Sequence, residues 1–259
     1  MKVAVGIEYD GSGFNGWQFQ SNGVSVQEKV EYALGFVADH PVRVVCAGRT
    51  DTGVHALEQV VHFETTVQRS ERSWVFGANA NLPKSIVVTW AREVDEAFHA
   101  RFSAQARRYR YVIFNRSVRP TFLACRVTWD HRPLDVERMA QAATCLVGEH
   151  DFNAYRASQC QAKSPVRTVQ ELKVSRKDEL VFIDIQANAF LHHMVRNIAG
   201  VLMAIGAGER PISWSQSVLQ SRERALGGVT APPYGLYLVD VEYPPEFDLP
   251  KNPYTQLVW

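Results

Sequence analysis

The order of the first structural elements is set by the stretch KVAVGIEYDGSGFNGWQFQSNGVSVQEKVEYALGFV, which spans residues 2–37. Lys2–Tyr9 is a short run rich in apolar residues, which predicts a strand. A Gly-rich loop, Asp10–Gly23, follows it, and Ser25 with Glu28 then forms a capping box that starts a helix. The apolar residues of this helix recur at helical spacing and would share one face, at Val26, Val30, Ala33, Leu34 and Val37.

The remainder of the first half continues this alternation. Apolar and β-branched runs predict strands at Val42–Ala47, Gln59–Phe63 and Ser85–Val94, and Ser73–Asn79 is expected to form a short helix that ends near Pro83. The resulting β-α-β-β-α-β order is typical of a ferredoxin-like domain, in which helices cover one face of an antiparallel sheet.

The second half repeats this mixed style without visible repetition of sequence. Its expected strands are Arg108–Asn115, Val169–Ser175, Leu180–Gln186 and Leu236–Val241, its expected helices are Val136–Leu146 and Phe190–Gly206, and a turn is expected at Gly148–Asp151. We therefore expect an α+β fold with two domains, residues 1–103 and 104–245, followed by an irregular tail at residues 246–259.

The composition is that of a globular protein, with 46% hydrophobic and 21% charged residues, and disorder is not expected. No leader and no membrane span are expected, because the longest apolar run, residues 197–208, is too short to cross a bilayer. The four cysteines form no CxxC pair and no zinc spacing, which favours reduced thiols in the cytoplasm.

The charge pattern is more informative than the net charge of +1, which argues against binding of nucleic acid by bulk charge. Arginine supplies 21 of the 28 basic residues, and the stretch from Arg101 to Arg126 contains seven arginines and no acidic residue. Arginine is suited to bidentate phosphate contacts and to stacking on bases. A solvated strand face would explain the same pattern.

The Gly-rich loop contains the spacing Gly11-x-Gly13-x-x-Gly16, which resembles a dinucleotide-binding fingerprint. That fingerprint needs a helix that begins within the loop and holds the pyrophosphate at its N-terminus, and here no helical pattern begins before Ser25. A tightly turned or flexible loop is the better interpretation. The alternative is a loop that contacts RNA, because Gln18 and three aromatic residues lie among the glycines. The aromatic residues are Phe14, Trp17 and Phe19.

Two further segments carry candidate chemistry. In Gly48–Ala56 (GRTDTGVHA), Asp51 lies on a loop that leaves a strand, where it could serve as an accessible carboxylate or close an Asx-turn. In Ala106–Tyr111 (ARRYRY), aromatic residues alternate with arginines along a strand. This alternation suits base stacking beside phosphate contacts, or a core strand with solvated arginines.

The third segment is Phe190–Asn197 (FLHHMVRN) at the start of an expected helix. An arginine in a cleft, here Arg196, would favour the ionised form of a carboxylate, although a surface arginine fits the pattern too. His192 and His193 would point in different directions on a helix, so no metal site is expected.

Together these segments resemble the TruA family of tRNA pseudouridine synthases. The resemblance covers nearly the whole chain in the right order, and Thr52 is a small departure at a position where the family commonly has Ala. Its motifs are YDGSGFNGWQFQ at Tyr9–Gln20, GRTDTGVHA at Gly48–Ala56, FHARFSA at Phe98–Ala104, RRYRYVIFN at Arg107–Asn115 and FLHHMVRNIAG at Phe190–Gly200.

The resemblance implies a role for each candidate residue. Asp51 would be the essential catalytic carboxylate, and Arg196 would pair with it. Arg49 would help to displace or replace the flipped base, and Tyr109 would stack on the target uracil and assist proton removal. The other expected substrate-binding residues are the arginines of the same strand, Arg107, Arg108 and Arg110.

The resemblance also implies an architecture and a substrate. The fold would consist of two ferredoxin-like (RRM-like) α/β-sandwich domains with a positive active-site cleft between them, and the protein would be a homodimer. Its partner would be tRNA, at uridines 38 to 40 of the anticodon stem-loop. No cofactor and no metal would be needed.

Two rival functions remain open at this point. A non-catalytic RNA-binding module would use the aromatic residues but would assign no role to Asp51. A nucleoside or glycoside hydrolase would need a second carboxyl group near Asp51, for which Glu58 and Glu64 are nearby in the sequence. The sequence also leaves open whether Asp51 attacks C6, attacks C1′ or removes a sugar proton.

Overall fold

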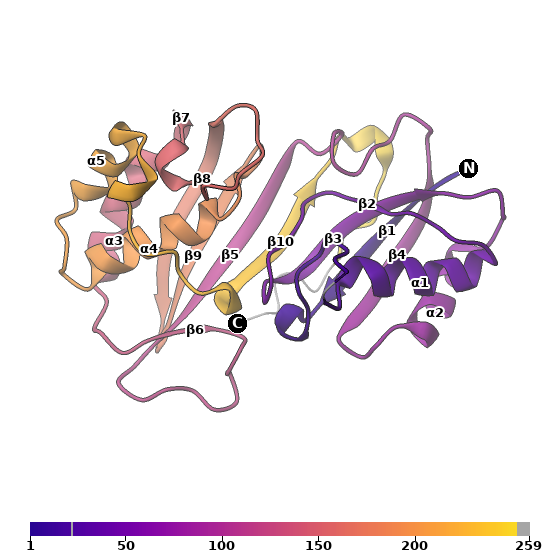
Figure 1. The fold of residues 1–259 in the computed structure, drawn as a ribbon, viewed down its shortest axis with the longest axis horizontal. Helices are drawn as coiled ribbons and strands as arrows, with labels where there is room; N and C mark the ends of the chain where they lie inside the picture. The colour runs from indigo at the N-terminus through magenta and orange to yellow at the C-terminus, as the bar shows by residue number, and fades with distance from the viewer. Residues whose placement is uncertain (22, 253–259) are drawn as a thin grey trace. The chain divides into compact units, whose positions relative to one another are not determined.

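The computed structural model describes residues 1–21 and 23–252. The described chain forms two compact units: residues 1–107 together with residues 237–252, and Arg108–Leu236 (Figure 1). The expected second domain ended at residue 245, whereas the structure groups residues from Tyr237 onward with the first unit. None of the helices in the described residues is long and apolar enough to cross a bilayer.

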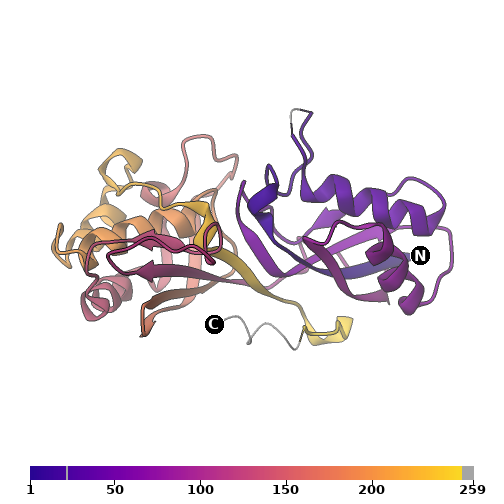
Figure 2. The ribbon, with the colours of Figure 1, turned by 90° about the horizontal axis from the view of Figure 1, so that it is seen from below.

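The first unit has the strand order β4-β1-β3, formed by β1 (Lys2–Tyr9), β3 (His55–Glu64) and β4 (Ile86–Val94), and both pairings are antiparallel. β2 (Val45–Cys46) pairs with β3 in antiparallel fashion, and β10 (Leu236–Glu242) runs parallel to β3. The helices α1 (Val26–Ala38) and α2 (Glu71–Asn81) cover one face of these strands (Figure 2). This arrangement confirms the α+β fold class and the ferredoxin-like order of the first half.

The start of helix α1 and its buried face largely agree with the prediction from the sequence. The Ser25 hydroxyl accepts a hydrogen bond from the Glu28 amide at 3.2 Å, and Asp39 ends the helix in a left-handed conformation with φ of 57°. Burial of Val26, Val30 and Leu34 on its inner face stabilises the fold by roughly 1.5–3 kcal/mol each. The buried positions are Val26, Val30, Ala33, Leu34 and Ala38, so that Ala38 takes the place expected for Val37.

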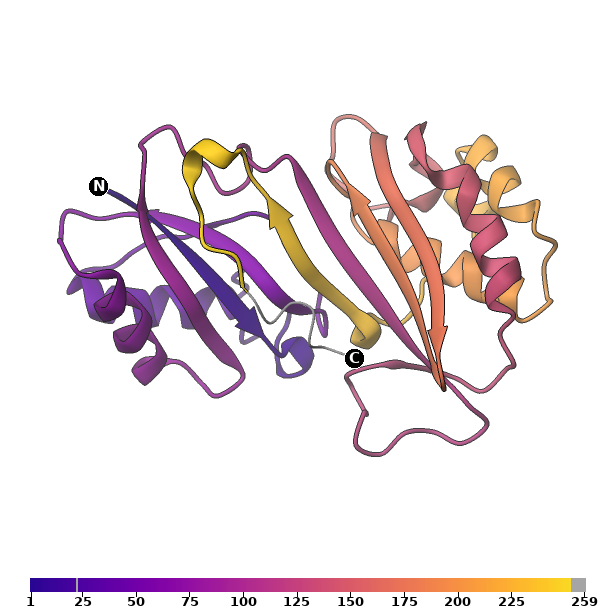
Figure 3. The same ribbon diagram turned by 180° about the vertical axis from the view of Figure 1, so that it is seen from behind.

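The second unit has the strand order β5-β9-β8-β7. Its strands are β5 (Ala106–Asn115, whose first two residues belong to the first unit), β6 (Thr128–Asp130), β7 (Gly148–Asp151), β8 (Val166–Lys177) and β9 (Leu180–Ala187), and β6 runs parallel to β5. Its helices are α3 (Val136–Ala143), α4 (Met194–Gly206) and α5 (Trp214–Ser221), which lie on one face of these strands (Figure 3).

Short 3₁₀ helices occur in both units. They are η1 (Gly11–Gly13), η2 (Thr144–Leu146), η3 (Asn153–Tyr155), η4 (Arg224–Leu226), η5 (Pro233–Gly235) and η6 (Pro245–Phe247). The last of them shows that the tail is not wholly irregular, and the expected tail residues 253–259 lie outside the described part of the chain.

Two local expectations were wrong because of hydrogen bonds that the sequence pattern does not reveal. The expected strand Val42–Ala47 shortens to β2, because the amide of Val44 donates to the Glu31 side chain at 3.1 Å instead of to a neighbouring strand. The expected turn Gly148–Asp151 is strand β7, since it pairs along its whole length with β8. Strand β6 and helix α5 were not predicted.

The expected helix Phe190–Gly206 begins four residues later, at Met194. His193 has a φ of 62°, in the left-handed region, and therefore lies outside the helix as its N-cap. The amide of Met194 closes a turn onto the carbonyl of Leu191 at 3.0 Å. His192 and His193 consequently do not diverge along a helix as expected, and their ring centroids lie 4.0 Å apart.

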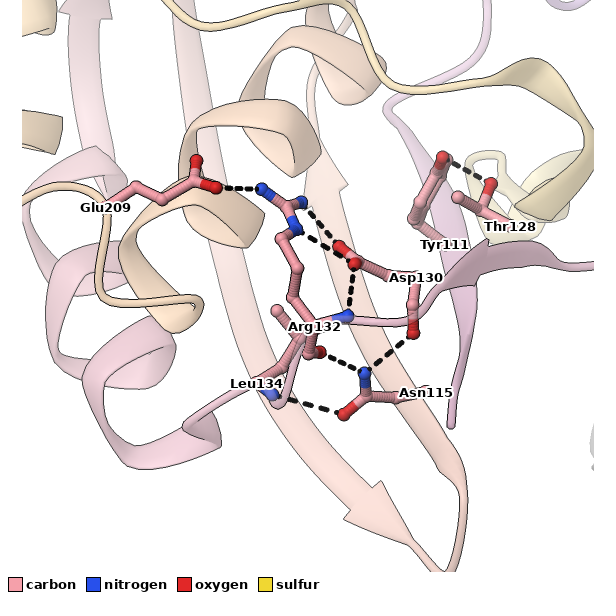
Figure 4. Close-up of polar contacts among 7 residues, drawn as sticks. All are labelled: Tyr111, Asn115, Thr128, Asp130, Arg132, Leu134 and Glu209. Atoms are coloured by element: carbon pink, nitrogen blue, oxygen red, sulfur yellow. Dashed lines mark hydrogen bonds and ion pairs between the residues drawn. The ribbon is translucent and has the colours of Figure 1, made fainter. Parts of the chain in front are cut away.

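A polar cluster at the end of β5 joins three segments of the second unit (Figure 4). The Asn115 amide group donates to the carbonyls of Asp130 and Arg132 at 2.9 and 2.6 Å and accepts from the Leu134 amide at 3.2 Å. Arg132 pairs with the Asp130 carboxylate and with Glu209. The side chain of Asn115 thereby supplies hydrogen-bond partners for backbone carbonyl and amide groups in the irregular segment between β6 and α3.

The face of the first unit opposite its helices holds a buried histidine. Phe63 packs on Trp74 of α2, so the adjacent His62 points to the other face, beside Phe98 and His99. The side chain of His62 is 6% exposed. Burial, followed by the nearby charges of His99 and Lys2, lowers the pKa of its imidazole to about 4 from an ordinary value of 6.5.

His62 should make stability fall in acid. Between pH 6.5 and about 4, the unfolded chain binds a proton at His62 that the folded chain does not. The free energy of unfolding should therefore decrease as the pH drops, by up to about 1.4 kcal/mol per pH unit from this group. Urea denaturation at a series of pH values across this range gives the free energy of unfolding at each pH. In His62→Gln this free energy should depend less steeply on pH than in the native protein. The exposed His131→Gln is the control, and an equal slope in all three proteins would contradict the assignment.

Candidate active site

Asp51 lies in a tight turn between β2 and β3. The Val54 amide donates to the Asp51 carbonyl at 3.1 Å, and Gly53 has a φ of 79° that a residue with a side chain rarely adopts. Thr50 is buried, Asp51 is half-buried and Arg49 is exposed. The turn thus holds the backbone of Asp51 while the residue stays partly exposed.

The Gly-rich loop supports this turn directly. The Trp17 amide donates to the Thr50 carbonyl at 3.0 Å, and the Tyr9 hydroxyl lies 2.7 Å from the Thr50 hydroxyl. Gly16 has a φ of 85°, and a Cβ at this position would lie 2.8 Å from the Thr50 carbonyl oxygen and 3.0 Å from the carbonyl carbon of Asp51. Only glycine permits this approach of the two backbones.

These contacts explain why glycines occur in the loop, and no bound nucleotide is needed to account for them. The loop is tightly turned, and two of its aromatic residues, Phe14 and Trp17, are 7% and 1% exposed. They belong to the core and offer little surface to RNA, whereas Phe19 is 50% exposed. Among the loop aromatics, the RNA-contacting interpretation therefore rests on Phe19.

His55, the histidine of the GRTDTGVHA segment, holds the other end of the turn. Its Nδ1 accepts from the Gly11 amide at 3.1 Å and lies 3.2 Å from the Asp10 carboxylate. Its ring stacks on Tyr237 of β10 at a centroid distance of 4.7 Å. The sequence did not reveal this role, because Tyr237 is distant along the chain.

Arg107 was expected to bind substrate, but its guanidinium is engaged inside the first unit. It is 8% exposed and donates to the carbonyls of Ala104 at 3.1 Å, Ala47 at 3.0 Å and Arg101 at 2.6 Å. Ala47 immediately precedes the GRTD segment. Arg107 therefore supports the chain that leads into the Asp51 turn, and a contact with RNA stays a prediction.

The next residues of β5 belong to the second unit. Tyr109 is 7% exposed, and its ring meets that of Phe190 edge to face at 5.0 Å. Arg110 forms a bidentate pair with Asp184 at 2.7 and 3.1 Å and lies over the ring of Phe182. Arg108 is half-buried. The charge of Arg110 is thus balanced by Asp184, and the binding of phosphate by Arg108 or Arg110 stays a prediction.

Arg196 lies in the first turn of α4 and is half-buried. Its Nε donates to the carbonyl of Ala231 at 2.8 Å, and the Ala231 amide donates to the carbonyl of Arg196 at 3.1 Å. The helix and the segment around Ala231 thus hold both the backbone and the side chain of Arg196.

Glu58 and Glu64 are the two candidates for the second carboxyl group that the hydrolase alternative needs. Glu58 is 4% exposed, and its carboxyl oxygens accept from Trp90 Nε1 and from the Asn252 amide, both at 3.3 Å. Burial raises the pKa of this carboxyl group to about 7. Glu64 is the exposed last residue of β3. Glu58 therefore anchors the segment around Asn252.

A family comparison and individual similar proteins carry the same description. The family described as tRNA pseudouridine synthase matches residues 6–103 and 142–244. A Pseudomonas aeruginosa protein named tRNA pseudouridine synthase A is 62% identical over 252 residues, covering 97% of this chain and 88% of that protein. Proteins of the same name from Nitrosococcus oceani and Coxiella burnetii are 59% and 55% identical, and the aligned regions cover 100% and 97% of each chain.

Gly16→Ala should loosen the Asp51 turn. The new methyl group would meet backbone atoms that cannot rotate away, and φ of 85° would be strained. We expect a loss of roughly 1–3 kcal/mol in the free energy of unfolding and faster hydrogen exchange at the Trp17 amide. Gly13→Ala is the matched control in the same loop, because a Cβ there meets nothing within 4 Å. Equal exchange in the two variants would refute the proposed support.

Proposed function

The chain belongs to the tRNA pseudouridine synthase family, and we propose that it converts uridines 38 to 40 of the tRNA anticodon stem-loop to pseudouridine, with Asp51 as the nucleophile. The observation that carries the assignment of Asp51 is the construction of its turn. Backbone contacts from the Gly-rich loop fix the peptide of a carboxylate that itself stays partly accessible. Catalysis by a positioned charge requires this kind of preorganisation.

The reaction is an isomerisation. The C1′–N1 bond breaks, the uracil turns, a C1′–C5 bond forms, and C5 loses its proton while N1 gains one. Atoms and electrons balance within the nucleotide, so the overall conversion requires no oxidant, reductant or nucleoside triphosphate. The residues of the protein need to open the RNA, cleave one bond, retain the free base and move a proton.

Opening the RNA comes first, because the target base must leave its stack at a cost of a few kcal/mol. Tyr109, by stacking on the uracil, would return about 1–3 kcal/mol. The exposed Arg49 is suited to fill the space that the base leaves, and the half-buried Arg108 to bind phosphate. Arg110 would contribute while it shares its charge with Asp184.

Cleavage is the task of Asp51. A carboxylate can attack as a nucleophile or stabilise positive character on the sugar, as in glycosidases. Arg196 would favour its ionised form. Attack at C6, attack at C1′ and removal of a sugar proton all begin from this ionised carboxylate. Tyr109 or a water molecule would then accept the C5 proton.

Retention of the detached uracil separates this function from that of a hydrolase. An aromatic slot closed by Tyr109 would hold the base until it has turned, whereas a hydrolase would release free uracil. Phe190 supports the ring of Tyr109 edge to face, which fixes the slot from one side. The expected cleft between the units, the homodimer and the cytoplasmic location stay predictions.

Asp51→Asn tests the reaction and its catalyst together. The substitution keeps the shape of the side chain but removes its charge, so the release of tritium from tRNA labelled at uridine C5 should fall by roughly three orders of magnitude. The native protein should release tritium and form pseudouridine. Thr52→Ala is the control, since it changes an exposed neighbour on the same turn and should retain activity.

Each alternative outcome identifies a different function. Equal tritium release by the native protein and Asp51→Asn would refute Asp51 as the nucleophile. Free uracil in the product would indicate a hydrolase. Tight tRNA binding by both proteins without any tritium release would indicate an RNA-binding module.

A further inference from the structure

A buried hydrogen-bond network lies beside Arg196 on α4. Asn197 is 2% exposed, and its side-chain oxygen accepts from the Thr230 hydroxyl at 2.7 Å and from Arg224 Nη2 at 3.0 Å. Arg224 Nη2 also donates to the Thr230 hydroxyl at 2.9 Å. The amide nitrogen of Asn197 donates to the Tyr155 carbonyl at 2.7 Å. The network therefore fastens both ends of residues 224–230 to the helix.

Two glycines let this segment lie directly on α4. A Cβ at Gly200 would fall 1.9 Å from the Val229 carbonyl oxygen, and one at Gly228 would fall 3.2 Å from the amide nitrogen of Val201. A side chain at Gly200 would therefore exclude the segment from this position, and one at Gly228 would require the backbone to shift by a few tenths of an ångström. Small shifts of the segment are opposed by steric contact on one side and by the hydrogen bonds on the other.

Ala231, which follows Thr230, transmits this placement to Arg196. Its carbonyl accepts from Arg196 Nε at 2.8 Å, and its amide donates to the Arg196 carbonyl at 3.1 Å. A guanidinium group is a rigid planar fork of donors. A bond at Nε consequently fixes the plane in which both Nη groups point.

We infer that Asn197, Thr230 and Arg224 form a positioning network for Arg196, which sets the orientation of its guanidinium for the reaction. The inference rests on the proposed function, in which Arg196 acts on the carboxylate of Asp51. The three residues act through Ala231 and do not touch substrate. They should therefore affect the chemical step more than the binding of tRNA.

Thr230→Val is the first test, because it keeps the size of the side chain and removes the hydroxyl group that joins Asn197 to Arg224. With an unmodified tRNA transcript as the substrate, kcat should fall about tenfold and KM should change by less than about twofold. Arg224→Lys, which keeps the charge but not the fork, should act in the same direction. Thermal denaturation checks that both variants are folded.

Two controls remove comparable hydrogen bonds elsewhere in the second unit. Thr144→Val deletes a hydroxyl bond to the Gln141 carbonyl at the end of α3. Arg138→Met deletes guanidinium bonds to the carbonyls of Ile205 and Arg210 at the far end of α4. Both should lower the thermal midpoint without changing kcat. If they lower kcat as much as Thr230→Val does, the effect is general loosening and the inference is overturned.

A double-mutant cycle separates the network from Arg196 itself. Arg196→Lys lacks Nε and the fork, so adding Thr230→Val to it should cause little further loss of kcat. Losses that multiply would show that Thr230 acts by another route and would overturn the inference. Arg196→Lys with native kcat would refute both the proposed role of Arg196 and the network. If kcat falls in Arg196→Lys but is native in Thr230→Val, the positioning network is refuted while the proposed role of Arg196 stands.

Discussion

The approach of two backbones at Gly16 is the constraint on which the first unit depends. The loop around Gly16 bonds to the turn of Asp51 through Trp17 and to the first turn of α1, where the amides of Val26 and Gln27 donate to the carbonyls of Gly16 and Trp17 at 3.2 and 3.0 Å. One loop thereby connects β1, α1 and the entrance to β3. The bonds through Trp17, Val26 and Gln27 use main-chain atoms, and Asp51 stays partly exposed.

In the second unit, too, glycines allow a backbone segment to lie close to another element. Gly200 and Gly228 bring a segment of backbone against α4, and that segment fixes the side chain of Arg196. In both units a charged residue is therefore held by hydrogen bonds to main-chain groups of a neighbouring segment. A reaction that develops charge needs such fixed groups, since rearranging them during the reaction would raise the barrier.

The sequence predicted those features that depend on neighbouring residues. The strand Lys2–Tyr9 and the capped helix after Ser25 follow from local pattern, and Asp51 was selected by resemblance. Features that depend on distant partners were missed, namely the short β2 and the structural bonds of Arg107. The late start of α4 was missed because the left-handed conformation of His193 is not visible in the residue pattern. Residue type alone does not distinguish an arginine that binds phosphate from one that bonds carbonyls, because both uses exploit the same donors.

The pairing of β10 with β3 has a consequence for the order in which the protein matures. Tyr237 stacks on His55 beside the Asp51 turn, yet the ribosome makes Tyr237 only after the entire second unit. Domains generally fold during synthesis from the N-terminus onward. Here the first unit must wait for the end of the chain before the turn gains its last support. A nascent or truncated polypeptide that has not yet reached β10 therefore lacks the ring that stacks on His55 beside the Asp51 turn.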